Sequence, residues 1–229
     1  RMDVIAGLEK AKPAMEYLRD AGVGCGVRIT IGEFNLSQLA SIIGAIENTG
    51  LKRFAVCQHI DGSDWKAVKE ERREIIDFLI DYAMKNPEME VVTEQLYDDG
   101  VYLLQRVAEH EPELAVEMEK LLARQGGCPA GDRIVNVDYR GNVHLCPYWQ
   151  YRTIGNIREQ KLSDICFDEE NEILAMMKDK TQHLKGKCGR CMHKHLCRGC
   201  GARAEEMCGD LFGTDPACYL TEEEVAAVR

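Results

Sequence analysis

The sequence predicts an α/β domain followed by a small cysteine-rich domain. Apolar runs rich in β-branched residues alternate with amphipathic helical segments over the first 125 residues, and a Gly126-Gly127 pair then interrupts the pattern. Nine of the 11 cysteines lie beyond residue 127. Strands that alternate with helices of this length form parallel βα units. We therefore expect two domains, residues 1–125 and 126–229.

The first domain should contain three strands, at residues 23–31, 53–60 and 90–96. A helix over 13–21 precedes them. Further helices are expected after Asn35, whose side chain suits an N-cap, and over 66–84 and 101–124, the last with a break at Glu111-Pro112. Three strands do not close a barrel. We therefore expect the second half of a larger fold, and a fragment, because Arg1 leads directly into a helical pattern.

The second domain should begin with a β-hairpin over residues 134–145, with its turn at Arg140-Gly141-Asn142. Gly141 suits the turn because positive φ costs glycine little. A helix is expected around 168–178. The rest of this cysteine-rich region is expected to be short of regular structure.

Composition excludes several functions. The 229 residues carry a formal charge of −10, which disfavours a nucleic-acid partner because phosphate contact needs a basic face. No run of 18 apolar residues and no basic amphipathic stretch occurs, so no membrane partner is expected. An odd number of cysteines crowded at one end disfavours a secreted disulfide scaffold. We expect a cytoplasmic protein with no signal peptide in this sequence.

The cysteine spacing points to metal ligation. It reads Cys-x12-Gly-x4-Cys, a gap of 41 residues, Cys-x2-Cys-x5-Cys-x2-Cys and a final cysteine, and it comprises Cys128, Cys146, Cys188, Cys191, Cys197, Cys200 and Cys218. Seven thiolates exceed what one zinc ion needs and suit one or two [4Fe–4S] clusters. Residues 183–200 carry five Lys and Arg and no acid, which would offset the negative charge of a cluster. A zinc-binding interaction module is the alternative from another class.

This order of cysteines resembles the SPASM extension of radical S-adenosylmethionine (SAM) enzymes. It departs once, because two residues separate Cys197 from Cys200 where the family has three. The resemblance narrows to the branch of alternative haem and haem d1 biosynthesis, in particular its didecarboxysirohaem deacetylases. The segments similar to that branch are Asp99-Gly-Val-Tyr-Leu103, Cys197-Arg-Gly-Cys-Gly-Ala-Arg-Ala204, Gly209-Asp210 and Asp215-Pro-Ala-Cys-Tyr-Leu220.

The resemblance implies that residues 1–125 are the C-terminal portion of a partial (β/α)6 radical SAM barrel and that residues 126–229 are a SPASM-type iron–sulfur domain. It implies seven cysteine ligands and an enzyme that modifies side chains of a sirohaem-derived tetrapyrrole through a 5′-deoxyadenosyl radical. Peptide or protein maturases share much of this tail and are the alternative within the enzyme class.

The family cleaves SAM at a further [4Fe–4S] cluster held by C-x3-C-x2-C, and no such spacing occurs in this sequence. We therefore expect the chain to be inactive alone. The resemblance makes the N-terminal half of the same enzyme a partner, and an electron donor such as ferredoxin or flavodoxin a second one.

Two residues of the first domain are candidate contacts for SAM or substrate, and no catalytic residue is identified. Arg28 lies in the middle of a strand, where it could face a carboxylate inside a barrel or merely cover a strand end. His59 ends a predicted strand, where barrel enzymes build their sites, although a surface-loop histidine is equally compatible.

Four further interpretations concern residues around the cysteines. Arg198 and Arg203 could clamp substrate carboxylates or offset cluster charge. Tyr148 and Trp149 would shield a cluster from water. Cys25 and Cys57 are expected to pack as small buried hydrophobes. Packing is also expected for Cys166 and Cys208, which lie outside the pattern.

Overall fold

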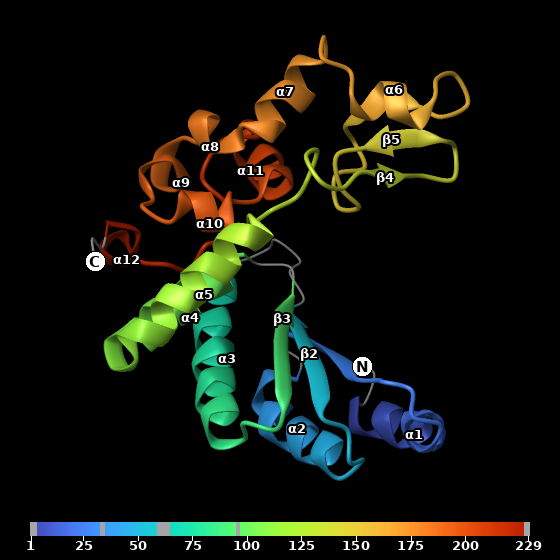
Figure 1. Ribbon diagram of the computed structural model, residues 1–229, viewed down its shortest axis with the longest axis vertical. Helices are drawn as coiled ribbons and strands as arrows, with labels where there is room; N and C mark the ends of the chain where they lie inside the picture. The colour runs from blue at the N-terminus through green and yellow to red at the C-terminus, as the bar shows by residue number, and fades with distance from the viewer. Residues whose placement is uncertain (1–3, 33–34, 59–64, 95–96, 227–229) are drawn as a thin grey trace. The chain divides into compact units, whose positions relative to one another are not determined.

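The structure is a computed structural model that describes residues 4–32, 35–58, 65–94 and 97–226 (Figure 1). The chain divides into two compact units, Arg1–Asp99 and Gly100–Arg229. This division falls ahead of the predicted boundary between residues 125 and 126, which stays a prediction.

The first unit is built on a parallel sheet. Strands β1 (Val27–Ile31), β2 (Arg53–Gln58) and β3 (Glu90–Glu94) lie in the order β1-β2-β3, and both neighbouring pairs are parallel. They alternate with α1 (Val4–Asp20), α2 (Leu39–Glu47) and α3 (Trp65–Lys85), as Figure 1 shows. The α/β class is therefore confirmed.

Strand β1 is shorter than the predicted run over 23–31. A Cβ atom at Gly26 would lie 2.9 Å from the carbonyl oxygen of Arg53, so the chain enters the sheet by a close backbone approach that glycine alone permits. The residues ahead of Val27 form the connection from α1 instead of extending the strand.

One face of the sheet forms the core of this unit. Alternate strand residues point to opposite faces, and four residues of the core face are at most 2% exposed: Ile29, Ile31, Phe54 and Val56. Three apolar residues on each of the two helices that follow β1 and β2 are at most 3% exposed: Ile42, Ile43 and Ile46 on α2, and Ile75, Ile76 and Leu79 on α3. Arg28 and Thr30 lie on the opposite face of β1 and are exposed.

Asn35 does not cap a helix through its side chain, which corrects the predicted N-cap. A 3-10 turn, η1 (Leu36–Gln38), separates it from α2. The Asn35 side chain is 2% exposed, accepts a hydrogen bond from Gly32 N (3.0 Å) and donates one to Thr30 O (3.0 Å). It therefore fixes the backbone that leaves β1.

The second unit begins with helices and a small antiparallel sheet. Helix α4 (Asp98–His110) is followed by α5 (Pro112–Gln125), so the predicted break at Glu111-Pro112 is confirmed. Strands β4 (Asn136–Val137), β5 (Asn142–His144) and β6 (Thr153–Asn156) lie in the order β4-β5-β6. The pairing of β4 with β5 confirms the predicted hairpin, and β6 adds a third strand that was not predicted.

Short helices fill the remaining sequence, so the expectation of little regular structure is wrong. They are α6 (Leu162–Cys166), α7 (Glu172–Lys178), α8 (Lys180–His183), α9 (Gly186–Arg190), α10 (Lys194–Cys197), α11 (Gly201–Cys208) and α12 (Glu222–Ala226). Most have fewer than eight residues, too few to show a helical period. Among the described residues, no helix is long and apolar enough to cross a membrane.

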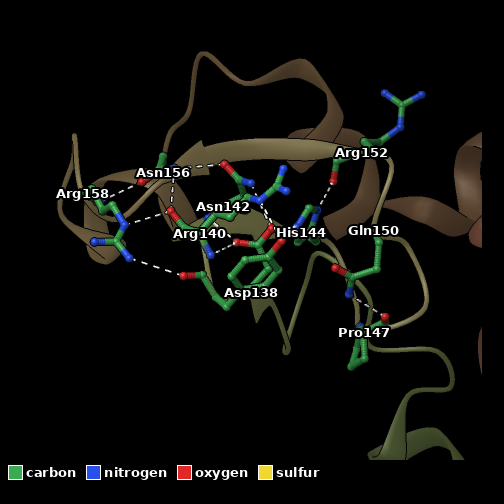
Figure 2. A network of polar contacts seen from close by, with 10 residues as sticks. Asp138, Arg140, Asn142, His144, Pro147, Gln150, Arg152, Asn156 and Arg158 are labelled. Carbon is green, nitrogen blue, oxygen red and sulfur yellow. Dashed lines mark hydrogen bonds and ion pairs between the residues drawn. The ribbon is translucent and has the colours of Figure 1, made fainter.

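Asp138 organises the hairpin turn that leads to Cys146 (Figure 2). Its carboxylate accepts hydrogen bonds from Arg140 N (2.8 Å), Asn142 N (2.9 Å) and Asn142 Nδ2 (2.9 Å), and lies 3.3 Å from His144 Nε2. Desolvation acts to raise the pKa of Asp138, but these bonds outweigh it and hold the pKa at about 2. Gly141 takes the turn's positive φ of 89°.

Candidate metal centres

The first group of thiols comprises Cys128, Cys146 and Cys200. They lie in one apolar cluster with the buried side chains of Trp149 and Met177. Burial raises the pKa of the Cys146 thiol, and that of Cys200 to about 12; the negative charge of a Cys128 thiolate acts in the same direction on both. The three sulfurs are therefore close enough to influence one another.

A tight backbone approach brings Cys128 to the later cysteines. Cys128 N donates a hydrogen bond to Cys197 O (3.0 Å). The preceding Gly127 has a φ of +60°, and a Cβ atom there would lie only 2.4 Å from the same carbonyl oxygen. Glycine at 127 is therefore required for this contact.

We take the four remaining pattern cysteines as the second group: Cys188, Cys191, Cys197 and Cys218. Burial raises the pKa of Cys188, and the nearby Cys191 adds to this effect. Asp215 N donates to Cys188 Sγ (3.4 Å), and Cys218 N donates to Asp215 O (3.2 Å), which brings the Cys218 loop beside Cys188.

Cys197 ends α10, which begins at Lys194, three residues after Cys191. Lys194 N donates to Cys191 O (3.2 Å), so the turn between these two cysteines is closed by its own backbone. The Cys-x2-Cys-x5-Cys spacing thus corresponds to α9, a tight turn and α10 in succession.

Asp215 connects the two groups. Its carboxylate accepts hydrogen bonds from Cys200 N (3.1 Å) and Ala217 N (3.1 Å), while its own amide contacts Cys188. Arg203 forms a bidentate ion pair with this carboxylate: Nε donates to Oδ1 (2.8 Å) and Nη2 donates to Oδ2 (2.6 Å). The structure thus pairs Arg203 with a carboxylate of the protein itself.

Several cations of the basic segment, residues 183–200, also pair with acidic side chains that lie outside this segment. Arg198, the described non-glycine residue with positive φ, pairs with Asp132 (2.6 Å) and donates to Met177 O (2.7 Å). Lys185 pairs with Asp210 (2.6 Å), and Arg190 pairs with Glu222 (3.1 Å). The sequence analysis expects all five cations of residues 183–200 to offset the charge of a cluster. Three of them are already balanced by acidic side chains of the protein.

Trp149 covers the first group, and Tyr148 does not. The Trp149 side chain is fully buried, and its Nε1 donates to Glu205 Oε2 (2.7 Å). Glu205 also pairs with Arg152. Tyr148 is 69% exposed, so the expectation that both aromatic residues shield this site holds for Trp149 alone.

The candidate contacts of the first domain lie apart from these thiols in the sequence. Arg28 Nε lies 2.5 Å from Glu94 Oε2, and the Arg28 side chain is half exposed, so it reaches across the sheet on the face opposite the core. Its role toward SAM or substrate stays a prediction. His59 lies outside the described residues.

Cysteines outside the pattern behave differently from one another. Cys57 is 1% exposed, with its sulfur 3.3 Å from Thr30 Oγ1, as a packed residue should be. Cys25 and Cys166 are only half-buried and Cys208 is exposed, so the expectation of packing is wrong for Cys208 and only partly met for the other two.

The donor set fits iron–sulfur chemistry. Five of the seven pattern cysteines are buried. Sulfur-only, water-excluded sites suit soft metals and iron–sulfur clusters. In the part of the chain that the structure describes, no three His, Cys, Asp or Glu side chains gather into a site for a single metal ion.

Comparison with known proteins identifies this region. Residues 128–192 match the model of SPASM, an iron–sulfur cluster-binding domain. The match begins at Cys128 and includes the hairpin, and it confirms the resemblance predicted from the cysteine spacing.

Similar proteins align with nearly all of this chain. Fe-coproporphyrin III synthase of Methanosarcina barkeri is 31% identical over 95% of the chain, and pre-heme d1 synthase of Dinoroseobacter shibae is 30% identical over 96%. The chain spans 58% of the length of each relative. The resemblance to the haem biosynthesis branch is therefore confirmed.

A solved structure supports the fold. SuiB of Streptococcus suis, crystallised with S-adenosylmethionine, aligns with a TM-score of 0.61 and 17% identity. The alignment covers 93% of this chain and 49% of SuiB. At this identity the likeness concerns the fold alone.

Proposed function

We propose that this chain supplies the auxiliary iron–sulfur part of a radical SAM enzyme that modifies side chains of a sirohaem-derived tetrapyrrole. Four of the seven pattern cysteines lie in residues 128–192, which match the SPASM model of an iron–sulfur cluster-binding domain, and this observation supports the proposal most directly. The names of the two relatives, which refer to iron coproporphyrin and pre-haem d1 synthesis, favour a tetrapyrrole substrate.

The two thiol groups would hold two auxiliary clusters. We assign Cys188, Cys191, Cys197 and Cys218 to one [4Fe–4S] cluster, and the first group, Cys128, Cys146 and Cys200, to the other. When bound, such clusters supply one-electron transfer. The chain's own residues exclude water through Trp149 and fix the thiols through Gly127 and Asp215.

Residues 1–125 would form the C-terminal portion of a partial (β/α)6 barrel, and residues 126–229 the iron–sulfur domain. The face of the sheet opposite the core carries Arg28, Thr30 and Glu94, which would suit polar contacts to SAM or substrate. His59 is retained as a second candidate contact.

The C-x3-C-x2-C motif for SAM cleavage does not occur in this sequence. In the proposal, the cluster that cleaves SAM belongs to the N-terminal half of the enzyme. The N-terminal half is therefore a partner of this chain, and this chain is inactive alone. A ferredoxin or flavodoxin of the cytoplasm would deliver electrons.

Metal and acid-labile sulfide per chain, measured after anaerobic reconstitution, test the proposal. We expect about eight irons with matching sulfide, and about four after C191A or C197A, because each cluster contains four irons. C208A removes an exposed thiol outside both groups and serves as the matched control. Iron unchanged in C191A and C197A would overturn the ligand assignment. Stoichiometric zinc without sulfide would favour the zinc-binding interaction module.

The substrate is tested separately with the cluster-loaded enzyme that includes the N-terminal half. Formation of 5′-deoxyadenosine should depend on added didecarboxysirohaem. Formation that depends instead on a precursor peptide would favour the peptide maturase and leave the cluster assignment intact.

A further inference from the structure

Lys180 is a buried cation with no carboxylate partner. It is the first residue of α8 and is 1% exposed. Its Nζ donates a hydrogen bond to Gly199 O (2.9 Å), and no Asp or Glu of the described residues lies within ion-pair distance. This contrasts with Arg198 and Arg203 nearby, each of which has an aspartate.

The position of this ammonium relates it to both thiol groups. Gly199, its hydrogen-bond acceptor, directly precedes Cys200 of the first group, and a Cβ atom on Gly199 would lie 3.3 Å from Cys188 Sγ of the second group. Burial raises the pKa of Cys146 and of Cys188, and the charge of Lys180 acts to lower both. One cation thus acts on a thiol of each group.

An isolated buried ammonium is unfavourable, because it loses hydration without gaining an opposite charge. Metal ligation requires thiolates, and a cluster with four thiolates is net negative. Loading would therefore supply the anion that Lys180 lacks.

We propose that Lys180 is a positioning residue that serves as the shared counter-charge of the two auxiliary iron–sulfur centres and raises the reduction potential of both. The inference rests on the proposed function. In each centre, one electron from a chemical reductant converts the 2+ core to the 1+ core, and no bond breaks and no proton moves. The fixed positive charge stabilises the more negative, reduced form.

The test compares reconstituted K180M and K180Q with the unmodified chain in a dye-mediated redox titration, monitored by electron paramagnetic resonance. Met matches the length of Lys without its charge, and Gln still offers a donor to Gly199 O. K180R keeps the charge. K161M removes an exposed lysine of the same unit and is the matched control.

At the midpoint potential of the unmodified chain, we expect the ratio of reduced to oxidised cluster to fall about tenfold at both centres in K180M and K180Q. This equals about 59 mV for a one-electron couple, and it is the order expected for removing one charge from a protein interior. K161M should leave both potentials unchanged, and K180R should stay within about threefold, because its charge is retained.

A second readout uses the metal-free chain. K180M should raise its midpoint of urea unfolding, because it removes a buried charge that has no partner before loading.

The outcomes separate the inference from the proposed function. Full iron loading in K180M and K180Q with both potentials unchanged would overturn the inference alone. A shift at one centre alone would refute the shared role. If even the unmodified chain takes up no iron and sulfide, the proposed function fails and the inference fails with it.

Discussion

Replacing Asp215 by asparagine should destabilise the second unit and weaken both thiol groups. The Asp215 side chain is 5% exposed and accepts hydrogen bonds from Cys200 N and Ala217 N. It also carries the negative charge that balances Arg203, which is 17% exposed. D215N keeps the shape of the side chain and removes the charge.

The magnitude follows from these exposures. Removing one partner of a buried ion pair costs about 3–5 kcal/mol, because the other charge is left unpaired. Solvent reaches part of Arg203, so we expect the lower end, about 3 kcal/mol for D215N. R203M should cost about 2 kcal/mol, because Asp215 keeps its two amide donors. The double variant should then lose about 3 kcal/mol, a coupling of about 2 kcal/mol.

Urea unfolding of the metal-free chain, followed by the fluorescence of the buried Trp149, measures these values. Iron content after reconstitution gives the second readout: D215N should lose iron from both groups, because Asp215 contacts Cys188 and Cys200. R203M should lose less. Single-variant effects that add within about 0.5 kcal/mol would refute the coupling and show that Asp215 and Arg203 act independently.

Three further predictions concern single residues. G127A should reduce iron loading, because a Cβ atom would meet a backbone oxygen at 2.4 Å, whereas the open helical G44A should load normally. Burial acts to raise the pKa of Glu205, but hydrogen bonds, first that from Arg152, lower it below 4.5. Its stabilising contribution is therefore present above pH about 4.5 and is lost as pH falls further, so E205Q should flatten the acid limb of the unfolding midpoint against pH. A carboxyl-carbon NMR titration should place the Asp138 midpoint at about 2, and a midpoint near 4 would show that its turn network does not form in solution.

Elements with a clear period could be predicted from the sequence. The parallel βα order, the break at Glu111-Pro112 and the pairing of β4 with β5 all follow from local patterns. The short helices could not, because helices of four or five residues complete barely one turn and owe their conformation to neighbours distant in sequence. Asn35 shows the same limit, since its type predicts a polar contact without predicting which backbone groups it binds.

The candidate ligands could be predicted, but not the charges around them. Two-residue spacing singles out Cys188 with Cys191 and Cys197 with Cys200, because such pairs reach a common centre. The resemblance to the SPASM pattern adds Cys128, Cys146 and Cys218. The first group depends on contacts between distant segments, since Cys128, Cys146 and Cys200 meet in one apolar cluster. The sequence shows that residues 183–200 are basic. It does not show that Arg198 and Lys185 pair with Asp132 and Asp210, which lie outside this segment. The burial of Lys180 could not be predicted, because the sequence around it does not show that this lysine is buried.

The architecture of the second unit explains why polar residues hold these thiols. After α5, its helices have four to eight residues and its strands two to four, so none can be stable alone and each depends on contacts with other segments. Asp215 and Arg198 supply such cross-links by binding backbone groups of other loops as well as charges. Metal ligation would add cross-links of the same kind, and its free energy would then contribute to folding. Residues that orient the thiols before loading reduce the ordering that ligation must still impose, which is why Asp215 and Gly127, although neither bears a ligand, are expected to govern how much iron the chain retains.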